Sequence, residues 1–593
     1  MKQINYDYLY PRFLHFWSQI KNSLRHLLKE PVFYVYLVAV VIYLPWFLPT
    51  LNEIVPWDET YFLASGKELL RGNWPVLGYG PLLSIVGGIS YLPFQHSPLW
   101  LIHTDSLSRF LLFSSVFIST WQVAKAMREQ FNPVVMFGFL FLSPILISNF
   151  EYPADLLFAS ISALAFSQAI KFLKTKALKH VWWTSFWLGL GMLTRGDALI
   201  LLIAFTVFIL IVGRHHEKWF KLLIAAIIPF FIISAGYVAL RGAFTGDFDT
   251  AMAYRSYTAF EQGQEIDLPG DEPHVDAPIE SYHVSRLLFG TPEENGYSVF
   301  KAISRNPAAY FRRLIKVIKA LPGLFLTAYY RRFGILIAAL ALRGLAALIK
   351  QKKIELAVLH FIWMLSLVAG IARTLVRVGY FRLFFFAMLS LAAIGLIALL
   401  NNIKNSYEGW FWAAGMVIVV VLAFIIGDYS IQFSMLVFLC WLLLVFVLSR
   451  NADKLIHWQS MAMLLLLSAG FLLSGGFRIY TPRNLEQQPR ESASIALRKF
   501  TEQGDFVLTC TSSVVFMAER QVANFCSSDI PEFEDSEEFI TWMRAQEFNA
   551  IYLDSASSGT LIEMVLDQKG RALKQVFGTE TGQSSIFLLE TNQ

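Results

Sequence analysis

The sequence predicts a polytopic α-helical membrane protein that ends in a small α/β domain. Of its 593 residues, 55% are hydrophobic and only 16% are charged, whereas soluble globular chains carry about 25% charged residues. Apolar runs of about 20 residues, the length that crosses a hydrocarbon core, recur as far as residue 475. From residue 481 onward they give way to short segments of helical and strand periodicity.

Thirteen of the apolar segments are predicted to span the membrane. Their approximate bounds are 31–51, 107–126, 133–150, 155–173, 181–194, 197–213, 218–239, 332–349, 354–374, 380–400, 409–427, 430–449 and 457–475. The first is expected to be retained, because no small-residue cleavage site follows it. A further apolar segment, 80–94, is short for a span and contains Gly87 and Gly88, so we expect an interfacial or re-entrant helix there.

The distribution of Lys and Arg predicts the orientation. With 80–94 left out of the count, the short loops on the side of the N-terminus hold 16 Lys and Arg against 5 Asp and Glu. These loops are 125–132, 171–180, 212–221, 343–355, 401–408 and 450–456. The excess of positive charge predicts that they and the N-terminal segment 1–30 are cytoplasmic, in a plasma (inner) membrane. The loops 52–106 and 240–331 of the transmembrane part 31–480, and the domain 481–593, then lie outside the cytoplasm.

Within this outer domain we expect two helices and three strands. The helices are predicted at 491–501 and 537–547, and the strands at 505–509, 550–553 and 584–589. The domain contains Cys510 and Cys526, while the third cysteine, Cys440, lies in an apolar run. In an oxidising compartment the first two would form a disulfide, and the alternative is two buried thiols. No Gly-rich βαβ unit opens the domain, which argues against a nucleotide-sugar site.

Two adjacent carboxylates, Asp58 and Glu59, follow the first span at the start of an amphipathic helix. In a purely structural role, Asp58 would be an N-cap and Glu59 a first-turn acid favoured by the helix dipole. In a catalytic role, one of them would be a general base at the membrane surface that deprotonates an acceptor hydroxyl or amine. Spacing alone leaves both interpretations open.

Three further ionisable residues lie close to hydrocarbon. Asp155 lies at the end of a span, and Arg195 and Asp197 lie in a very short hairpin. Ionisable groups in such places are costly, so they usually pair or bind a ligand. A structural ion pair of Arg195 with Asp155 or Asp197 and an active-site role for Asp155 are the two alternatives.

Two segments of the second outer loop carry clustered polar residues. A basic amphipathic helix is predicted over 305–320, with Pro307 at its first position, and its cations would contact anionic lipid headgroups or the phosphate of a lipid donor. These cations are Arg312, Arg313, Lys316 and Lys319. The stretch 261–295 is expected to be a solvated mobile loop, the alternative being a cation site. Its candidate ligands are Asp271, Glu272, His274, Asp276, Glu280 and His283.

Five short motifs of the chain together resemble those of one enzyme family. An Asp-Glu motif follows the first span, as PWDETY at 56–61. A proline motif opens a juxtamembrane helix, as GYGPLL at 78–83, and a Pro-Asp motif follows the third span, as YPADLL at 152–157. A Gly-rich helix ends in GLGMLTRGD at 189–197. Late in the bundle, an outer-face Arg-Tyr pair corresponds to Arg377, Tyr380 and Arg382. In this order the motifs resemble those of the GT-C superfamily of membrane glycosyltransferases, in the branch of the protein O-mannosyltransferases and lipid A aminoarabinose transferases.

The resemblance implies an inverting glycosyltransferase that uses a polyprenyl-phosphate sugar. In that assignment Asp58 is the base, and Glu59 and Asp155 are supporting acids. Arg377 and Arg382 hold the donor phosphate, since arginine stabilises developing charge on phosphate with a planar fork of donors. Further candidate substrate contacts are Tyr79, Arg195 and Tyr380. No metal ligands are assigned; a divalent cation is a candidate cofactor.

The resemblance leaves the donor's sugar open. Tyr79 and Gly80 stand where the aminoarabinose branch has an acid and a lysine, and the histidine of many mannosyltransferase-like members is missing. The acceptor, a cell-envelope lipid, glycan or protein, is equally undetermined. The alternatives are a transporter or lipid flippase, and a polysaccharide polymerase or ligase with a diphosphate-linked donor. A nucleic-acid partner is not expected, because no basic stripe carries interleaved aromatic residues.

Overall fold

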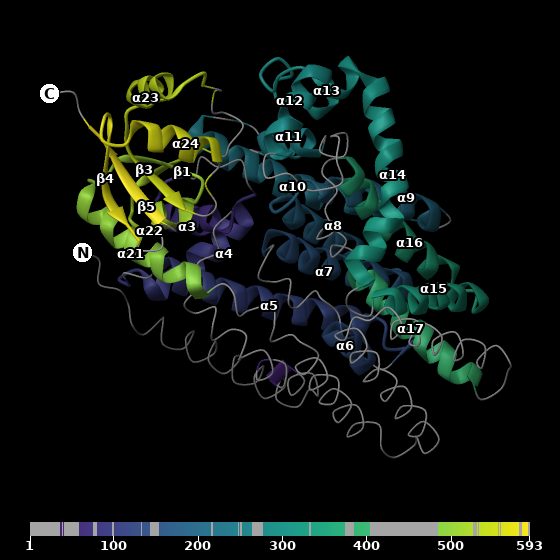
Figure 1. The fold of residues 1–593 in the computed structure, drawn as a ribbon. Coiled ribbons are helices and arrows are strands. Elements are labelled where there is room, and N and C mark those ends of the chain that lie inside the picture. Colours follow the sequence, from purple (N-terminus) through teal and green to yellow (C-terminus); the bar gives the residue numbers. More distant parts are fainter. Residues whose placement is uncertain are drawn as a thin grey trace, which may run out of the picture.

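The computed structural model describes most of the chain between residues 58 and 403 and most of the C-terminal part from 484. The described residues are 36–37, 40, 58–74, 80–97, 100–131, 133–142, 153–214, 218–246, 248, 252–263, 277–330, 334–373, 385–403, 484–525, 531, 533–554, 557, 559–579 and 584–590. They form a bundle of apolar helices, a group of shorter helices near one end of it, and a separate sheet with its own helices (Figure 1).

The apolar helices agree in position with the predicted spans wherever the structure describes the chain. They are α5 (Trp100–Ala126), α6 (Pro133–Leu142), α7 (Pro153–Thr175), α8 (Leu178–Met192), α9 (Asp197–Gly213), α10 (Trp219–Thr245), α15 (Gly334–Lys350), α16 (Ile354–Arg373) and α17 (Phe385–Ile403). Among the described residues α5, α7 and α10 are long and apolar enough to cross a membrane. Of the span predicted at 31–51 only three residues are described, and the spans predicted at 409–427, 430–449 and 457–475 lie outside the described residues.

Phenylalanines form much of the interior of the bundle. Phe117, Phe137 and Phe166, for example, are almost completely buried, and Phe117 stacks on Phe137 with ring centroids 4.6 Å apart. Between α15 and α17 the backbones touch, because a Cβ on Gly344 or Gly395 would run into the facing helix. Small residues at such a crossing allow the close packing that stabilises helix pairs in membranes.

The predicted inner loops meet at one end of the bundle. Lys174 pairs with Glu129 at 2.9 Å, and Lys176 pairs with Glu355 at 2.7 Å, so the loops 125–132, 171–180 and 343–355 are neighbours. Nearby, at the starts of α8 and α10, Trp182, Trp183 and Trp219 are 40–47% exposed. Exposed tryptophans beside lysines are typical of a membrane–water interface. These three of the six predicted inner loops therefore lie together at one end of the bundle. The side of the membrane on which this end lies stays a prediction.

Shorter helices form the two outer loops. The first loop contains α3 (Asp58–Leu70), α4 (Pro81–Tyr91) and the 3-10 turn η1 (Leu92–Phe94), so the segment 80–94 is helical, as expected. The second loop contains α11 (Met252–Gln262), α12 (Ala277–Phe289), α13 (Val299–Arg305) and α14 (Pro307–Tyr330). The prediction of a mobile loop over 261–295 is therefore wrong for 277–289, which form α12. This helix packs through Phe289 against Tyr257 and Phe260 of α11, and burial of these rings stabilises it.

The C-terminal α/β unit, residues 484–590, is built on a mixed five-stranded sheet. Its strands are β1 (Phe506–Thr509), β2 (Gln521–Asn524), β3 (Phe548–Asp554), β4 (Leu573–Gly578) and β5 (Ser584–Leu589), in the order β2-β1-β3-β5-β4. Strands β2, β1 and β3 are parallel, and β5 runs antiparallel to both neighbours. Its helices are α21 (Asn484–Phe500), α22 (Ser512–Met517), α23 (Ser536–Ala545) and α24 (Gly559–Gln568). The predicted strands at 505–509, 550–553 and 584–589 correspond to β1, β3 and β5.

Alternating residues of the strands face two layers of helices. Val507 and Tyr552 pack under α21 and α22, whereas Leu508 and Ile551 pack under α23 and α24. The buried Cys510, one residue after β1, is disulfide-bonded. The alternative of a buried thiol is thus wrong for Cys510; Cys526 lies outside the described residues. Phe525, the last residue described before it, donates its backbone N–H to the carbonyl of Thr509 at 2.9 Å.

Candidate functional site

Motifs that are far apart in the sequence meet at one end of the bundle. Asp155 lies in the first turn of α7, and Arg195 lies in the turn between α8 and α9. The start of α4 joins the same turn, because Leu82 donates its backbone N–H to the carbonyl of Leu193 at 3.2 Å. The Pro-Asp motif, the proline motif and the Leu-Thr-Arg motif therefore form one site.

Arg195 is the centre of a nearly buried charge cluster. Its guanidinium pairs with Asp155 and with Asp197, the latter with Nη2 at 2.8 Å from Oδ2. The side chains of the two acids are about one-tenth exposed and that of Arg195 about one-fifth. The predicted structural pair thus exists, with both acids on one arginine. One guanidinium thus lies between two carboxylates that would otherwise repel each other.

Helix α16 contacts this cluster through a glycine. A Cβ on Gly370 would lie 2.7 Å from Oδ1 of Asp197, so only glycine leaves room for the carboxylate. The helix ends three residues later, at Arg373, and the chain then enters the segment that carries Arg377, Tyr380 and Arg382. These three residues lie outside the described residues, as does Tyr79. The sequence alone did not indicate Gly370, because nothing in its neighbourhood distinguishes it from other glycines in apolar helices.

Helix α3 begins at Asp58, so Asp58 and Glu59 form its first turn, as the sequence predicts. Their side chains lie outside the described residues. The helix itself is closely packed: a Cβ on Gly66 would run into the backbone of Ser84 and Gly88 in α4, and a Cβ on Gly88 would lie 2.9 Å from the carbonyl oxygen of Gly66. The glycines of the segment 80–94 thus bring α4 into backbone contact with the helix that carries the two acids.

The C-terminal unit contacts α3 on another side, through α22 (Figure 1). Thr60 and Ser512 share a buried hydrogen bond of 3.0 Å between their hydroxyl oxygens, and the rings of Tyr61 and Phe516 meet edge to face with centroids 5.0 Å apart. The C-terminal unit therefore lies at the same end of the bundle as the first outer loop. The sequence analysis did not predict this contact.

Helix α14 is amphipathic, with Pro307 as its first residue, as expected. Phe311, Ile315 and Ile318 are 53–60% exposed on one face, and Arg312, Lys316 and Lys319 follow the same spacing one residue on. An exposed apolar stripe beside a cationic stripe suits the membrane surface.

Arg313, however, is only 1% exposed and does not belong to this cationic stripe. It lies over the ring of Phe260 and donates Nε–H to the carbonyl of Gly263 at 2.9 Å. The prediction that it contacts lipid phosphate is wrong, because the helical register places it with the buried Ala309 and Val317.

Two further expectations concern ligands. Of the proposed cation ligands, the residues 271–276 and the side chains of Glu280 and His283 lie outside the described residues, and no group of three His, Cys, Asp or Glu among the described residues could hold a metal ion.

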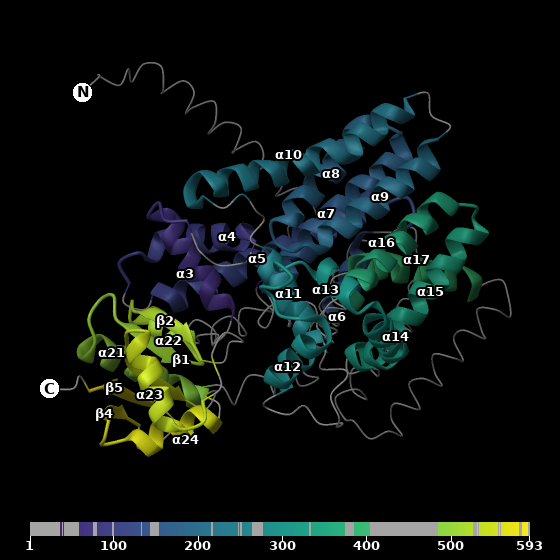
Figure 2. The same cartoon turned by 90° about the horizontal axis from the view of Figure 1, so that it is seen from above.

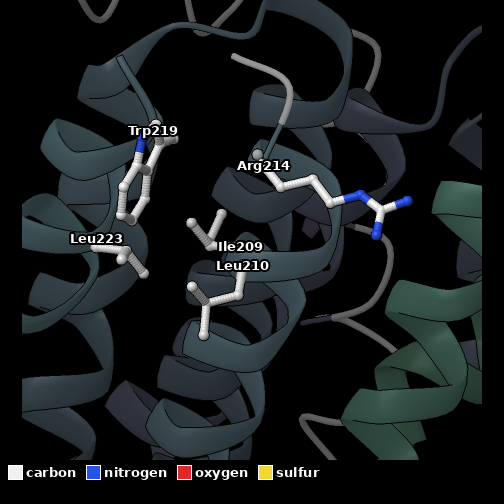
Figure 3. A pocket seen from close by; sticks show the side chains of 6 residues that line it. Ile209, Leu210, Arg214, Trp219 and Leu223 are labelled. Carbon is white, nitrogen blue, oxygen red and sulfur yellow. The ribbon is translucent and has the colours of Figure 1, made fainter. Parts of the chain in front are cut away.

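A cavity of about 200 Å³ lies between α9 and α10, where Trp219 and Leu223 face Ile209 and Leu210 and Arg214 extends away from Trp219 (Figure 3). Ile209, the lining residue nearest to Asp197 along α9, lies about 18 Å from it at 1.5 Å per residue.

Comparisons with known proteins identify the fold. No protein-family model and no curated protein sequence matches the chain. The structure is similar to that of ArnT from Cupriavidus metallidurans, with a TM-score of 0.55 for the apo state and 0.54 for the form bound to undecaprenyl phosphate. In both cases the identity is 13%, and the match covers 94–95% of this chain and 99% of the other.

The oligosaccharyltransferase from Archaeoglobus fulgidus in its apo form is also similar, with a TM-score of 0.50 and 13% identity over 95% of this chain and 74% of that one. ArnT and this oligosaccharyltransferase share the GT-C fold, so the predicted GT-C-like helical fold is confirmed, while the count of thirteen spans stays a prediction. With its apolar helices, the chain has the architecture of an integral membrane protein.

Proposed function

We propose that this protein is a glycosyltransferase that transfers a sugar from a polyprenyl-phosphate carrier to an acceptor on the outer face of the membrane. One observation supports this above all others: three family motifs meet at one site in a chain with the fold of ArnT, a lipid A aminoarabinose transferase whose structure also exists with bound undecaprenyl phosphate. At 13% identity the likeness concerns the fold, so the assignment of activity depends on the convergence of the motifs.

In the proposed reaction Asp58 accepts the proton of the acceptor hydroxyl or amine. The acceptor atom forms a bond to the anomeric carbon while the bond from that carbon to the phosphate oxygen breaks. The configuration inverts, and the polyprenyl phosphate leaves with the bonding electron pair. A carboxylate suits this role because proton transfer to a positioned base contributes about 10²- to 10⁴-fold to a rate. Glu59, the next residue of the same helical turn, is a supporting acid.

The leaving phosphate gains charge, so cations next to it stabilise the transition state. We assign this role to Arg377 and Arg382, with Tyr79 and Tyr380 as further contacts of the donor. The two arginines and Tyr380 lie in the segment that follows α16, and Gly370 of α16 packs on Asp197. This position in the chain supports their assignment. Arg195, expected to contact substrate, is occupied by two carboxylates, and we propose that it acts by holding Asp155 in the site.

The donor class is testable with the purified protein in proteoliposomes. Undecaprenyl-phosphate sugars, among them the mannose and aminoarabinose forms, are supplied together with membrane extracts as acceptors, and the released undecaprenyl phosphate is measured by mass spectrometry. We expect release from at least one of these donors and transfer of its sugar to the extract. Consumption of a diphosphate-linked glycan in a parallel reaction, with no release from any single-phosphate donor, would contradict the proposal.

The parallel reaction is required because the structure also resembles an oligosaccharyltransferase. That likeness favours polysaccharide or oligosaccharide transfer as the second candidate. A transporter or flippase would move a labelled carrier lipid between leaflets without breaking its sugar–phosphate bond, so a leaflet-accessibility assay on the same proteoliposomes separates this third alternative.

A further inference from the structure

Helix α3 and the segment 512–519, which consists of α22 and the turn after it, contact each other through side chains that are seven residues apart in both. Thr60 meets Ser512 at one end, and Lys67 meets Glu519 at the other, with Lys67 Nζ 2.6 Å from Oε1. Both pairs have the same separation of 452 residues along the chain, so the two segments run parallel. Seven residues are two turns of α3, so Thr60 and Lys67 lie on one face of that helix. Ser512 is the first residue of α22, whereas Glu519 lies in the turn after it.

Apolar contacts fill the space between these two polar contacts. Met517 is 2% exposed and belongs to a buried cluster with Leu63, Tyr91, Trp100 and further residues at the start of α5, while Phe516 packs against the cluster. The cluster therefore contains residues of α3, α4, α5 and the C-terminal unit. Burial of this apolar surface stabilises the contact between the C-terminal unit and the helices of the first loop.

Lys67 is the most constrained charge of the interface. It is 5% exposed, and its ammonium lies over the ring of Trp100 at 4.3 Å and near that of Tyr91 at 5.7 Å. A buried ammonium is costly unless a partner compensates it, and here the two rings and Glu519 do so. The hydrogen bond from Lys67 lowers the pKa of Glu519 below its ordinary value of 4.5, a direction that burial opposes and the charge of Lys67 reinforces.

The backbone of the C-terminal unit presents Glu519 in an unusual conformation. Glu519 has φ of 57° in the left-handed region, where few residues other than glycine are found. It lies two residues after Met517, the last residue of α22, and its backbone N–H donates to the carbonyl of Phe516 at 3.0 Å. The next residue, Arg520, is fixed by a hydrogen bond to Thr501 Oγ1 at 2.7 Å. Glu519 thus extends toward α3 from a turn that these hydrogen bonds hold in place.

We propose that the C-terminal α/β unit holds α3, and with it the Asp58–Glu59 turn, in the reactive position, and that Lys67 and Glu519 are positioning residues of the transfer reaction. This inference rests on the proposed role of Asp58. Glycine contacts fix α3 against α4, and α22 covers another side of it, with Thr60 only two residues after Asp58 (Figures 1 and 2). In this role the unit acts on the site through α3.

The first test is independent of activity. Hydrogen–deuterium exchange of the full-length protein reports how firmly α3 is held. Glu519→Gln and Lys67→Met should raise the exchange rate of the amides in 58–70 by about 10-fold, whereas Lys67→Arg, which keeps the cation, should change it much less. The matched control is Glu68→Gln. Glu68 is the residue next to Lys67, and this change removes its exposed ion pair with Arg71. Equal exchange in all four variants and the wild type would overturn the proposal.

The second test asks whether the interface acts through Asp58. With undecaprenyl-phosphate sugar as the probe, Lys67→Met should lower kcat by about 10-fold and leave KM for the donor within a factor of two, because small displacements of a catalytic group reduce the rate strongly. In an Asp58→Asn background the same change should have little further effect. Additive losses would show that Lys67 is merely structural and would overturn its positioning role.

These tests separate two failures. If Asp58→Asn retains wild-type transfer, the proposed role of Asp58 as the base is wrong, whatever the exchange data show. If Asp58→Asn is inactive while Lys67→Met keeps the wild-type kcat and exchange rates, the function stands and the inference about the C-terminal unit is wrong.

Discussion

The charge cluster around Arg195 and the α3–α22 interface are built in different ways. The first joins three charged residues within 43 positions of the chain, and each of them belongs to, or directly follows, a recognisable motif. The second joins residues 452 positions apart, mostly through apolar and aromatic contacts with one ion pair at the edge. The difference teaches that the sequence reveals chemistry near hydrocarbon more readily than it reveals the surfaces that hold this chemistry in place.

If the charge cluster is a unit, breaking its centre should have the largest effect on stability. Arg195→Met leaves Asp155 and Asp197 nearly buried beside each other, so we expect the free energy of unfolding to fall by about 3–5 kcal/mol. Thermal unfolding in detergent measures this loss. Arg71→Ala breaks an exposed pair and should cost about 1 kcal/mol or less. Similar losses in both variants would contradict the account of the cluster.

A second substitution tests the close contact between Gly88 of α4 and Gly66 of α3. Gly88→Ala places a methyl group 2.9 Å from the carbonyl oxygen of Gly66, and such overpacking costs about 1–3 kcal/mol. The matched control is Gly236→Ala in α10, where a Cβ meets no atom within 4 Å. Because alanine has a higher helix propensity than glycine, Gly236→Ala should keep or raise the midpoint of thermal unfolding. A loss as large in Gly236→Ala as in Gly88→Ala would contradict the role assigned to the crossing.

The smallest expected effect concerns pH. Because the pKa of Glu519 is lowered in the folded protein, the stability it contributes is present above the ordinary pKa of glutamate. That contribution is lost as the pH falls through the lowered value. The difference in unfolding midpoint between wild type and Glu519→Gln should therefore be largest near neutral pH and shrink on acidification. A difference that grows as the pH falls would contradict the assigned ion pair.

The sequence predicted the elements whose signal is local. Apolar runs correspond to α5, α7 and α10, and Pro307 is the first residue of α14. Asp58 is the first residue of α3, and Asp155 lies in the first turn of α7. It failed where tertiary packing decides. The sequence predicts Arg313 to be one of four equivalent surface cations, whereas the register of α14 buries it beside Phe260. The stretch 277–289 reads as a polar loop, yet packing of Phe289 on α11 makes it a helix.

The interface shows the same limit at long range. Thr60 and Lys67 share a face of α3 by their spacing, but spacing does not identify a partner 452 residues away. Likewise, Gly87 and Gly88 indicated a break in an apolar segment, whereas in the structure Gly88 allows contact with Gly66 of another helix. Contacts between distant segments follow from the fold and leave little trace in a single sequence.

The measurement that tests the central claim most directly is undecaprenyl phosphate release by Asp58→Asn. Asparagine keeps the size of the side chain and an oxygen that can cap the helix but cannot accept the proton, so release should fall by about 10²-fold or more at unchanged expression. Glu68→Gln, an exposed change in the same helix, should keep the wild-type rate. Release by Asp58→Asn at close to the wild-type rate would contradict the assignment of Asp58 as the base and the mechanism built on it.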